Sequence, residues 1–161
     1  MTGENSRTVS FDIRQDDLIG PGILSLLRYH LQEMHRHSPP GNVHSLAPET
    51  LRGEDVTFYS VWISGELAGC GALKRLDSHH GELKAMRTAP AHLRRGVGDA
   101  MLRHLIAEGR ARAYRRLSLE TGRPEPFHAA HALYRKHGFA PCPPFADYTD
   151  DPFSLCMTRT L

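Results

Sequence analysis

The chain of 161 residues carries 20 basic and 18 acidic side chains, for a formal net charge of +2 with the histidines neutral. This length suits one domain with a single core, and the balanced charge offers no overall field for nucleic acid or an anionic membrane. Three widely spaced cysteines, a polar N-terminus and the lack of a long apolar run argue against a disulfide framework, a cysteine zinc site, a signal peptide and a membrane span. We expect a cytoplasmic protein with one domain over residues 8–161, and residues 1–7 are candidates for a disordered tail.

Hydrophobic periodicity predicts a mixture of strands and helices along the chain. Apolar residues recur at helical spacing over 23–34 and again after residue 97, whereas 56–63 is rich in β-branched and aromatic residues. In chain order, the predicted elements are a strand at 8–14, a helix at 23–34, a short helix near 48, strands at 56–63, 66–76 and 82–88, a helix from 97, a strand at 117–121, a helix at 127–137, and strands from 139 and at 154–159.

Short turns indicate how the predicted strands pair. Ser64-Gly65 separates two strand-like runs by two residues, which is the spacing of a tight hairpin, and 77–81 forms a second turn. Residues 56–88 therefore predict an antiparallel meander of three strands. The helix after residue 97 separates the third of these strands from the strand at 117–121, so these two can lie parallel. The apolar stripe that we expect this helix to pack on the sheet is Val97, Met101, Leu102, Leu105 and Ile106.

A basic, glycine-spaced loop joins the third strand of the meander to this helix. Gly96 and Gly98 lack Cβ atoms, so backbone N–H groups there can approach an anion, and the helix directs its positive dipole end to the same place. Arg94 and Arg95 add guanidinium groups that match phosphate oxygens. The stretch at 86–100 therefore predicts a site for a phosphate-bearing ligand, although a G-x-G sequence alone often marks only a turn.

The order of these parts resembles the GNAT superfamily of acetyl-CoA-dependent N-acetyltransferases. The likeness is strongest at 86–100 and in an L-Y-x-x-x-G-F motif that begins at Leu133 and ends at Phe139. It implies an α+β (α/β) fold, with a mixed central sheet of about six to seven strands that splay at the cofactor site and about four flanking helices. A closer likeness is to bacterial stand-alone members of the superfamily, and it identifies no acceptor.

The resemblance places acetyl-CoA at the glycine-spaced loop. In the family, the pantetheine arm lies between the splayed strands and pairs with the backbone of the first strand, and backbone amides hold most of the pyrophosphate. Two positions depart from the family pattern, because Leu93 occupies the usual first basic position of the loop and Phe127 stands where asparagine is frequent. The residues that the resemblance assigns to the cofactor are Met86, Arg87, Thr88, Arg94, Arg95, Gly96, Val97, Gly98, Asp99 and Ala100.

Acetyl transfer to an amine needs a base for the nucleophile and a proton for the departing thiolate. Tyr134 is the candidate acid, since the unperturbed pKa of a tyrosine, about 10, is close to that of a thiol. The resemblance implies that this tyrosine lies near the cofactor sulfur. Glu120 and Glu82 lie on the strands that border the proposed gap and are candidate bases, either directly or through water.

Strict alternation along the strand before the loop would direct Glu82, Lys84, Met86 and Thr88 to one face of the sheet. Members of the superfamily often carry an acidic residue in place of Lys84. This lysine is therefore a candidate partner for a substrate carboxylate, and the alternative is a solvated strand lysine. Further candidates for the acceptor end, taken from the resemblance, are His35, His44 and Tyr148.

The leading hypothesis is direct acetyl transfer from acetyl-CoA to the amine of a small molecule. Acetylation of protein lysines or N-termini is an alternative, and the departures at positions 84 and 93 leave a non-catalytic acyl-CoA-binding sensor open. A nucleotide is disfavoured because neither G-x-x-x-x-G-K-[ST] nor G-x-G-x-x-G occurs. No metal is expected, since only His128 and His131 share a helix face and no third ligand is marked. The sequence does not determine the oligomeric state, and the resemblance is compatible with a homodimer.

Overall fold

The computed structural model describes residues 10–43 and 47–161. The helices and strands follow one another in the predicted order. Their bounds are β1 (Asp12–Gln15), α1 (Pro21–His37), α2 (Pro48–Leu51), β2 (Val56–Ile63), β3 (Glu66–Asp77), β4 (His80–Thr88), η1 (Pro90–His92), α3 (Val97–Ala111), β5 (Arg116–Gly122), η2 (Glu125–Phe127), α4 (His128–Lys136), β6 (Ala140–Cys142) and β7 (Ser154–Thr160).

The strands of the described residues join one seven-stranded mixed sheet in the order β1-β2-β3-β4-β5-β7-β6. β2, β3 and β4 form the predicted antiparallel meander. β4 and β5 run parallel, whereas β7 pairs antiparallel with both β5 and β6. The predicted α+β fold, with a mixed sheet and four α-helices, is confirmed.

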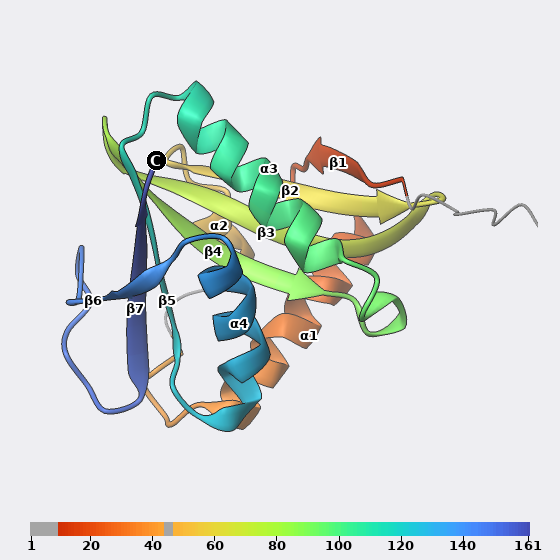
Figure 1. Ribbon diagram of the computed structural model, residues 1–161. Helices are drawn as coiled ribbons and strands as arrows, with labels where there is room; N and C mark the ends of the chain where they lie inside the picture. The colour runs from red at the N-terminus through yellow and green to blue at the C-terminus, as the bar shows by residue number, and fades with distance from the viewer. Residues whose placement is uncertain (1–9, 44–46) are drawn as a thin grey trace, which may run out of the picture.

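Helices cover both faces of this sheet. α3 and α4 lie on one face, and α1 and α2 lie on the other (Figure 1). Each face carries its own apolar cluster, and the predicted stripe of α3 lies in the first of them. Leu102 and Leu105 are fully buried there, and burial of each such side chain contributes about 1.5–3 kcal/mol. Among the described helices, none is long and apolar enough to span a membrane.

Most predicted boundaries differ from the observed ones by a few residues, and three of the differences have a structural reason or a consequence. β1 begins at Asp12, and the first predicted residues of that strand, 8 and 9, lie outside the described residues. α1 begins earlier than predicted, because Pro21 occupies its first turn, where a missing N–H costs nothing. The turn predicted at 77–81 is shorter, with β4 starting at His80. Gly81 therefore serves packing within a strand, since a Cβ there would approach the Tyr114 ring to 2.8 Å.

The parallel strands β4 and β5 separate soon after they meet. Their pairing covers only His80–Arg116, Gly81–Leu117 and Glu82–Ser118. Beyond Glu82 the two strands diverge, so within the described part of the chain the edge of β4 that faces β5 has no partner strand up to Thr88. The predicted splay of the sheet is confirmed, and it opens a space between the two strands.

Candidate active site

A β-bulge interrupts β4 within the opening. Between the cross-strand pairs Cys70–Arg87 and Ala72–Lys84, one residue of β3 faces two residues of β4. The bulged backbone at Ala85 has a positive φ of 53°, which is uncommon for a residue other than glycine. The extra residue changes which side chains of β4 share a face.

The predicted alternation is therefore wrong beyond Lys84. Met86 packs into the apolar cluster on the α3 face of the sheet. Arg87 instead points to the α1 face, where its guanidinium contacts His30 and Tyr29. After the bulge, Arg87 rather than Met86 shares a face with Lys84.

A pocket of about 220 Å³ occupies the place where the strands diverge. Its walls come from β4 at 82–87, from β5 at 119–121, from one face of α1, and from α4 together with the loop between β6 and β7. Residues that are far apart in the sequence therefore meet here, including all three predicted proton-transfer residues. These three residues are Tyr134, Glu120 and Glu82.

Burial tunes two of these groups in a useful direction. Glu120 is partly buried, and desolvation raises the pKa of its carboxyl to about 7, against smaller opposing effects of Ser154 and Lys84. Tyr134 is only 8% exposed, and burial raises the pKa of its phenol to about 12. At neutral pH the pocket thus holds a carboxyl close to its titration midpoint and a phenol that keeps its proton.

Glu82 has a different environment, because its carboxylate already has two donors. It is 2% exposed, and its Oε2 accepts a hydrogen bond of 2.5 Å from the Tyr148 hydroxyl. Lys84 Nζ lies 3.3 Å from the same oxygen and 3.2 Å from the Tyr148 oxygen. Burial and the nearby Glu82 carboxylate raise the pKa of Tyr148. Lys84 is therefore an ion-pair partner of Glu82 on the pocket wall.

The contribution of α1 to the pocket differs from the one predicted. His35 is exposed and lies outside the pocket lining, which instead includes His30, Glu33 and His37. These residues share a face because their spacings of three and four positions follow the helical period. That spacing was available in the sequence and could have favoured His37 over His35. His44 lies outside the described residues.

His30 and Arg87 form a buried polar contact beside the pocket. His30 is 4% exposed, and its Nδ1 accepts a hydrogen bond of 2.8 Å from Arg87 Nε. The accepting nitrogen carries no proton, so the neutral ring has its proton on Nε2. Burial, and secondarily the Arg87 charge, lower the pKa of His30 to about 3. The ring is therefore an uncharged acceptor that fixes the Arg87 guanidinium.

The glycine-spaced loop enters α3 through a left-handed residue. Gly96 has a φ of 83° and precedes α3 without any side-chain cap, so the first N–H groups of the helix have no intrahelical partner. A Cβ at Gly98 would lie 3.2 Å from Leu133 of α4. Arg94 and Arg95 are exposed beside this turn, as is Leu93. The loop therefore places backbone donors beside two exposed arginine side chains.

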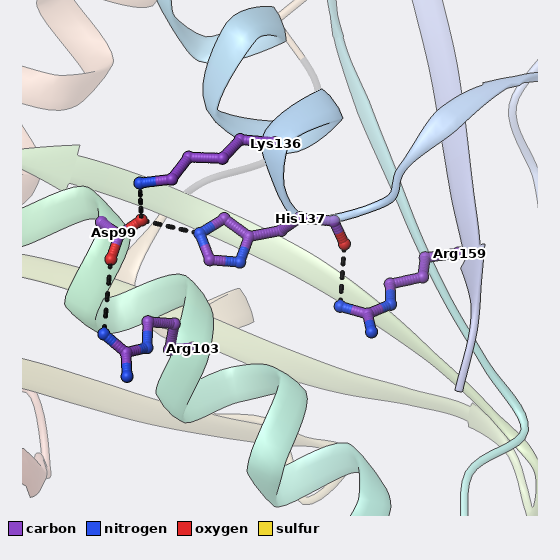
Figure 2. A network of polar contacts seen from close by, with 5 residues as sticks. All are labelled: Asp99, Arg103, Lys136, His137 and Arg159. Atoms are coloured by element: carbon purple, nitrogen blue, oxygen red, sulfur yellow. Dashed lines mark hydrogen bonds and ion pairs between the residues drawn. The ribbon is translucent and has the colours of Figure 1, made fainter.

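The side chain of Asp99 belongs to a network that joins α3 to α4 (Figure 2). Its Oδ1 lies 2.7 Å from Nε2 of His137 and 2.9 Å from Nζ of Lys136, and its Oδ2 lies 3.8 Å from Arg103. Hydrogen bonds from His137 and Lys136 lower the pKa of Asp99. The carbonyl oxygen of His137 in turn accepts a hydrogen bond from Arg159 of β7. The Asp99 carboxylate thus faces α4.

Comparisons with known proteins agree with this geometry. The model of the acetyltransferase (GNAT) family matches residues 24–139. The uncharacterized N-acetyltransferase YsnE of Bacillus subtilis (strain 168) is 52% identical over 149 residues, which are 92% of this chain and 99% of that protein. A candidate acyl-CoA N-acyltransferase from Klebsiella pneumoniae has a similar structure, with a TM-score of 0.75, 28% identity, and coverage of 94% of this chain and 97% of that chain.

A further similar structure is a GNAT family acetyltransferase from Elizabethkingia anophelis with acetyl-CoA bound. Its TM-score is 0.70 at 20% identity, with coverage of 94% of this chain and 98% of that chain. The splayed mixed sheet, the family model and the relative of 52% identity together identify the class of the chain as acyltransferase. The chain belongs to the GNAT acetyltransferase family, as the motifs indicated, and it is an N-acetyltransferase.

Proposed function

We propose that the protein transfers an acetyl group from acetyl-CoA directly to the amine of a small molecule. The observation that carries this proposal is the joint placement of Glu120 and Tyr134 on the pocket at the opening between β4 and β5. One is a carboxyl whose pKa is about 7, and the other is a buried phenol whose pKa is about 12. They match the two proton transfers that the reaction needs.

The glycine-spaced loop fits the pyrophosphate of acetyl-CoA. The positive φ of Gly96 presents the open N–H groups of α3, and a Cβ at Gly98 would make a tight contact of 3.2 Å with Leu133. Arg94 and Arg95 are free to add charge from the exposed side of the loop. Acetyl-CoA bound to the structurally similar Elizabethkingia anophelis protein supports the same ligand here.

The unpaired edge of β4 fits the pantetheine arm. Residues 83–88 of this strand have no partner in β5, so the backbone groups that they direct toward β5, on the edge away from β3, suit the amides of an extended ligand. Backbone N–H groups on this edge also suit the thioester carbonyl, and one such donor contributes about 3 kcal/mol to lowering the barrier. Acetyl-CoA supplies the activated acetyl group when it is bound.

The pocket residues divide the proton transfers between them. Glu120 accepts the proton of the acceptor ammonium or amine, because at pH values above about 7 it is ionised. Tyr134 donates a proton to the departing thiolate, because its phenol stays protonated well above neutral pH. Glu82, held by Tyr148 and Lys84, positions this wall of the pocket instead of taking the proton.

The size of the pocket favours a small acceptor. Its volume of about 220 Å³ is below the roughly 300–1,000 Å³ of sites for drug-sized ligands. The deciding experiment incubates the protein with acetyl-CoA and a panel of amines, measures free CoA, and identifies acetylated products by mass. We expect release of CoA with a subset of small amines. Acetylation of peptide or protein amines together with inert small amines would overturn the proposal.

A further inference from the structure

We propose that the amine acceptor also carries a carboxylate, and that Arg87 binds this carboxylate and sets the specificity of the enzyme. This inference rests on the proposed function, because it concerns the same pocket. It starts from the bulge in β4, which directs Arg87 to the α1 side, where the guanidinium lies on the pocket wall. The class of acceptor that it implies is an amino acid or a similar amino-carboxylate.

The Arg87 guanidinium is held in place before any ligand binds. Its Nε donates to His30 Nδ1 at 2.8 Å, and its central carbon lies 5.7 Å from the centre of the Tyr29 ring. The contact to His30 uses the Nε edge, so the two terminal nitrogens keep their donors. A guanidinium presents these donors as a planar fork that matches the two oxygens of a carboxylate.

Within residues 10–43 and 47–161, no carboxylate forms an ion pair with Arg87. The other cation on the pocket wall, Lys84, is paired with Glu82. A partly buried guanidinium without an anionic partner has lost hydration that no counter-charge replaces. A ligand carboxylate would supply the missing charge.

The remaining charges of the pocket fit an acceptor that carries both groups. Glu33 lies 3.4 Å from His37 and 3.7 Å from Arg36, so its carboxylate has polar partners on its own helix, one of them a fixed cation. Glu120, on β5, is without an ion-pair partner among the described residues and is the proposed base for the amine. A carboxylate bound at Arg87 on β4 leaves the amine of the same molecule to face β5.

The test uses matched sets of acceptors: amino acids, their carboxamides and the corresponding amines that lack the carboxyl group. Rates at saturating acetyl-CoA are compared after correction for the fraction of free amine. We expect the wild-type protein to prefer the carboxylate member by at least about 10-fold in kcat/KM, and the preference to reside mainly in KM. Carboxylic acids without an amine should inhibit competitively against the acceptor.

Arg87→Gln should remove the preference for carboxylate-bearing acceptors and the inhibition by amine-free carboxylic acids. Its KM for acetyl-CoA should stay within about 2-fold of the wild-type value. Arg87→Lys keeps the charge but lacks the fork and the contact to His30, so we expect it to retain part of the preference. Arg75→Gln, which removes an exposed arginine from the adjacent strand β3, is the matched control and should behave as the wild type.

The outcomes separate this inference from the proposed function. Acetylation of small amines without any preference for the carboxylate member would overturn the inference alone, as would an unchanged preference in Arg87→Gln. If Arg87→Gln does not fold, inhibition of the wild type by amine-free carboxylic acids decides, and its absence overturns the inference. A wild-type protein that acetylates no small amine would overturn the proposed function itself.

Discussion

The Tyr148 hydroxyl donates a hydrogen bond of 2.5 Å to Oε2 of Glu82, although the two residues are 66 positions apart. This contact anchors the loop between β6 and β7 to the wall of the pocket. Tyr148→Phe would remove this donor, and the buried Glu82 carboxylate would keep its contact with Lys84 Nζ. We expect a loss of about 1–3 kcal/mol in the free energy of unfolding, measured by urea titration.

Glu82→Gln provides the partner measurement for a double-mutant cycle. The amide keeps an acceptor for the Tyr148 hydroxyl but loses the charge that faces Lys84. We expect the double variant to be less destabilised than the sum of the two single variants, with a coupling of about 0.5–3 kcal/mol. Strict additivity would show that the charge of Glu82 does not strengthen its hydrogen bond with Tyr148.

Glu120→Gln tests the proposed base through the pH dependence of the rate. The carboxylate form is the active one, and the pKa of Glu120 is raised to about 7, so the wild-type rate should rise through an inflection near pH 7. The variant should lose about 10²–10⁴-fold in rate and show no inflection there. Glu125→Gln, an exposed change on η2, is the control and should keep the wild-type profile. An inflection that persists in Glu120→Gln would assign it to another group.

The same substitution should have the opposite effect on stability. Because the pKa of Glu120 is raised from its ordinary value of 4.5, the folded protein binds the proton more tightly, and stability falls as pH rises from about 4.5 to about 7. Allowing for solvent screening of this partly exposed carboxyl, the loss is roughly 1–2 kcal/mol. We therefore expect the difference in melting temperature between Glu120→Gln and the wild type to favour the variant more at pH 8 than at pH 5.

Tyr134→Phe removes the proposed acid without changing the shape of the side chain. We expect kcat to fall by about 10²–10⁴-fold, because the thiolate then leaves without a proton from the protein. Calorimetric affinity for acetyl-CoA should stay within about 2-fold of the wild type. Tyr114→Phe removes another buried phenol, under the far end of the sheet, and should leave turnover unchanged. Equal turnover in Tyr134→Phe and the wild type would exclude Tyr134 as the acid.

Gly96→Val tests the loop as the pyrophosphate site. A β-branched residue is strained at a φ of 83°, and its side chain would stand beside the first N–H groups of α3. We expect acetyl-CoA affinity to fall by at least about 10-fold. Gly41 has a φ of 88° with open space around it, so Gly41→Val imposes similar strain away from the loop. Equal losses of affinity in the two variants would mean that strain, and not the loop, is responsible.

Most of the secondary structure could be predicted from hydrophobic periodicity and from the residues that form turns and helix caps. The apolar stripe of α3, the two-residue hairpin at Ser64-Gly65 and the left-handed Gly138 after α4 each have a local physical cause, so the sequence alone located them. The prediction that β4 and β5 splay apart came from the family resemblance. The assignments of Tyr134 and Glu120 to one pocket depended on the same motifs.

The pocket walls proposed to contact the acceptor could be predicted less well from the sequence. The bulge at Ala85 has no compositional signal, because an alanine in a strand gives no hint of a positive φ. The contacts between Tyr148 and Glu82 and between Arg87 and His30 join residues 66 and 57 positions apart, and no periodicity reports such pairs. Their geometry depends on how the loop and α1 close over the sheet.

The extra residue in β4 also determines how this enzyme can be compared with others position by position. With the bulge, Arg87 lies three residues beyond Lys84 on the same face of the sheet, whereas a regular strand would place the residue two positions beyond Lys84 there. A protein without the bulge therefore places the counterpart of Arg87 among the apolar residues beneath α3. Grafting an arginine at the aligned position would transfer acceptor preference only between enzymes that share this one-residue insertion.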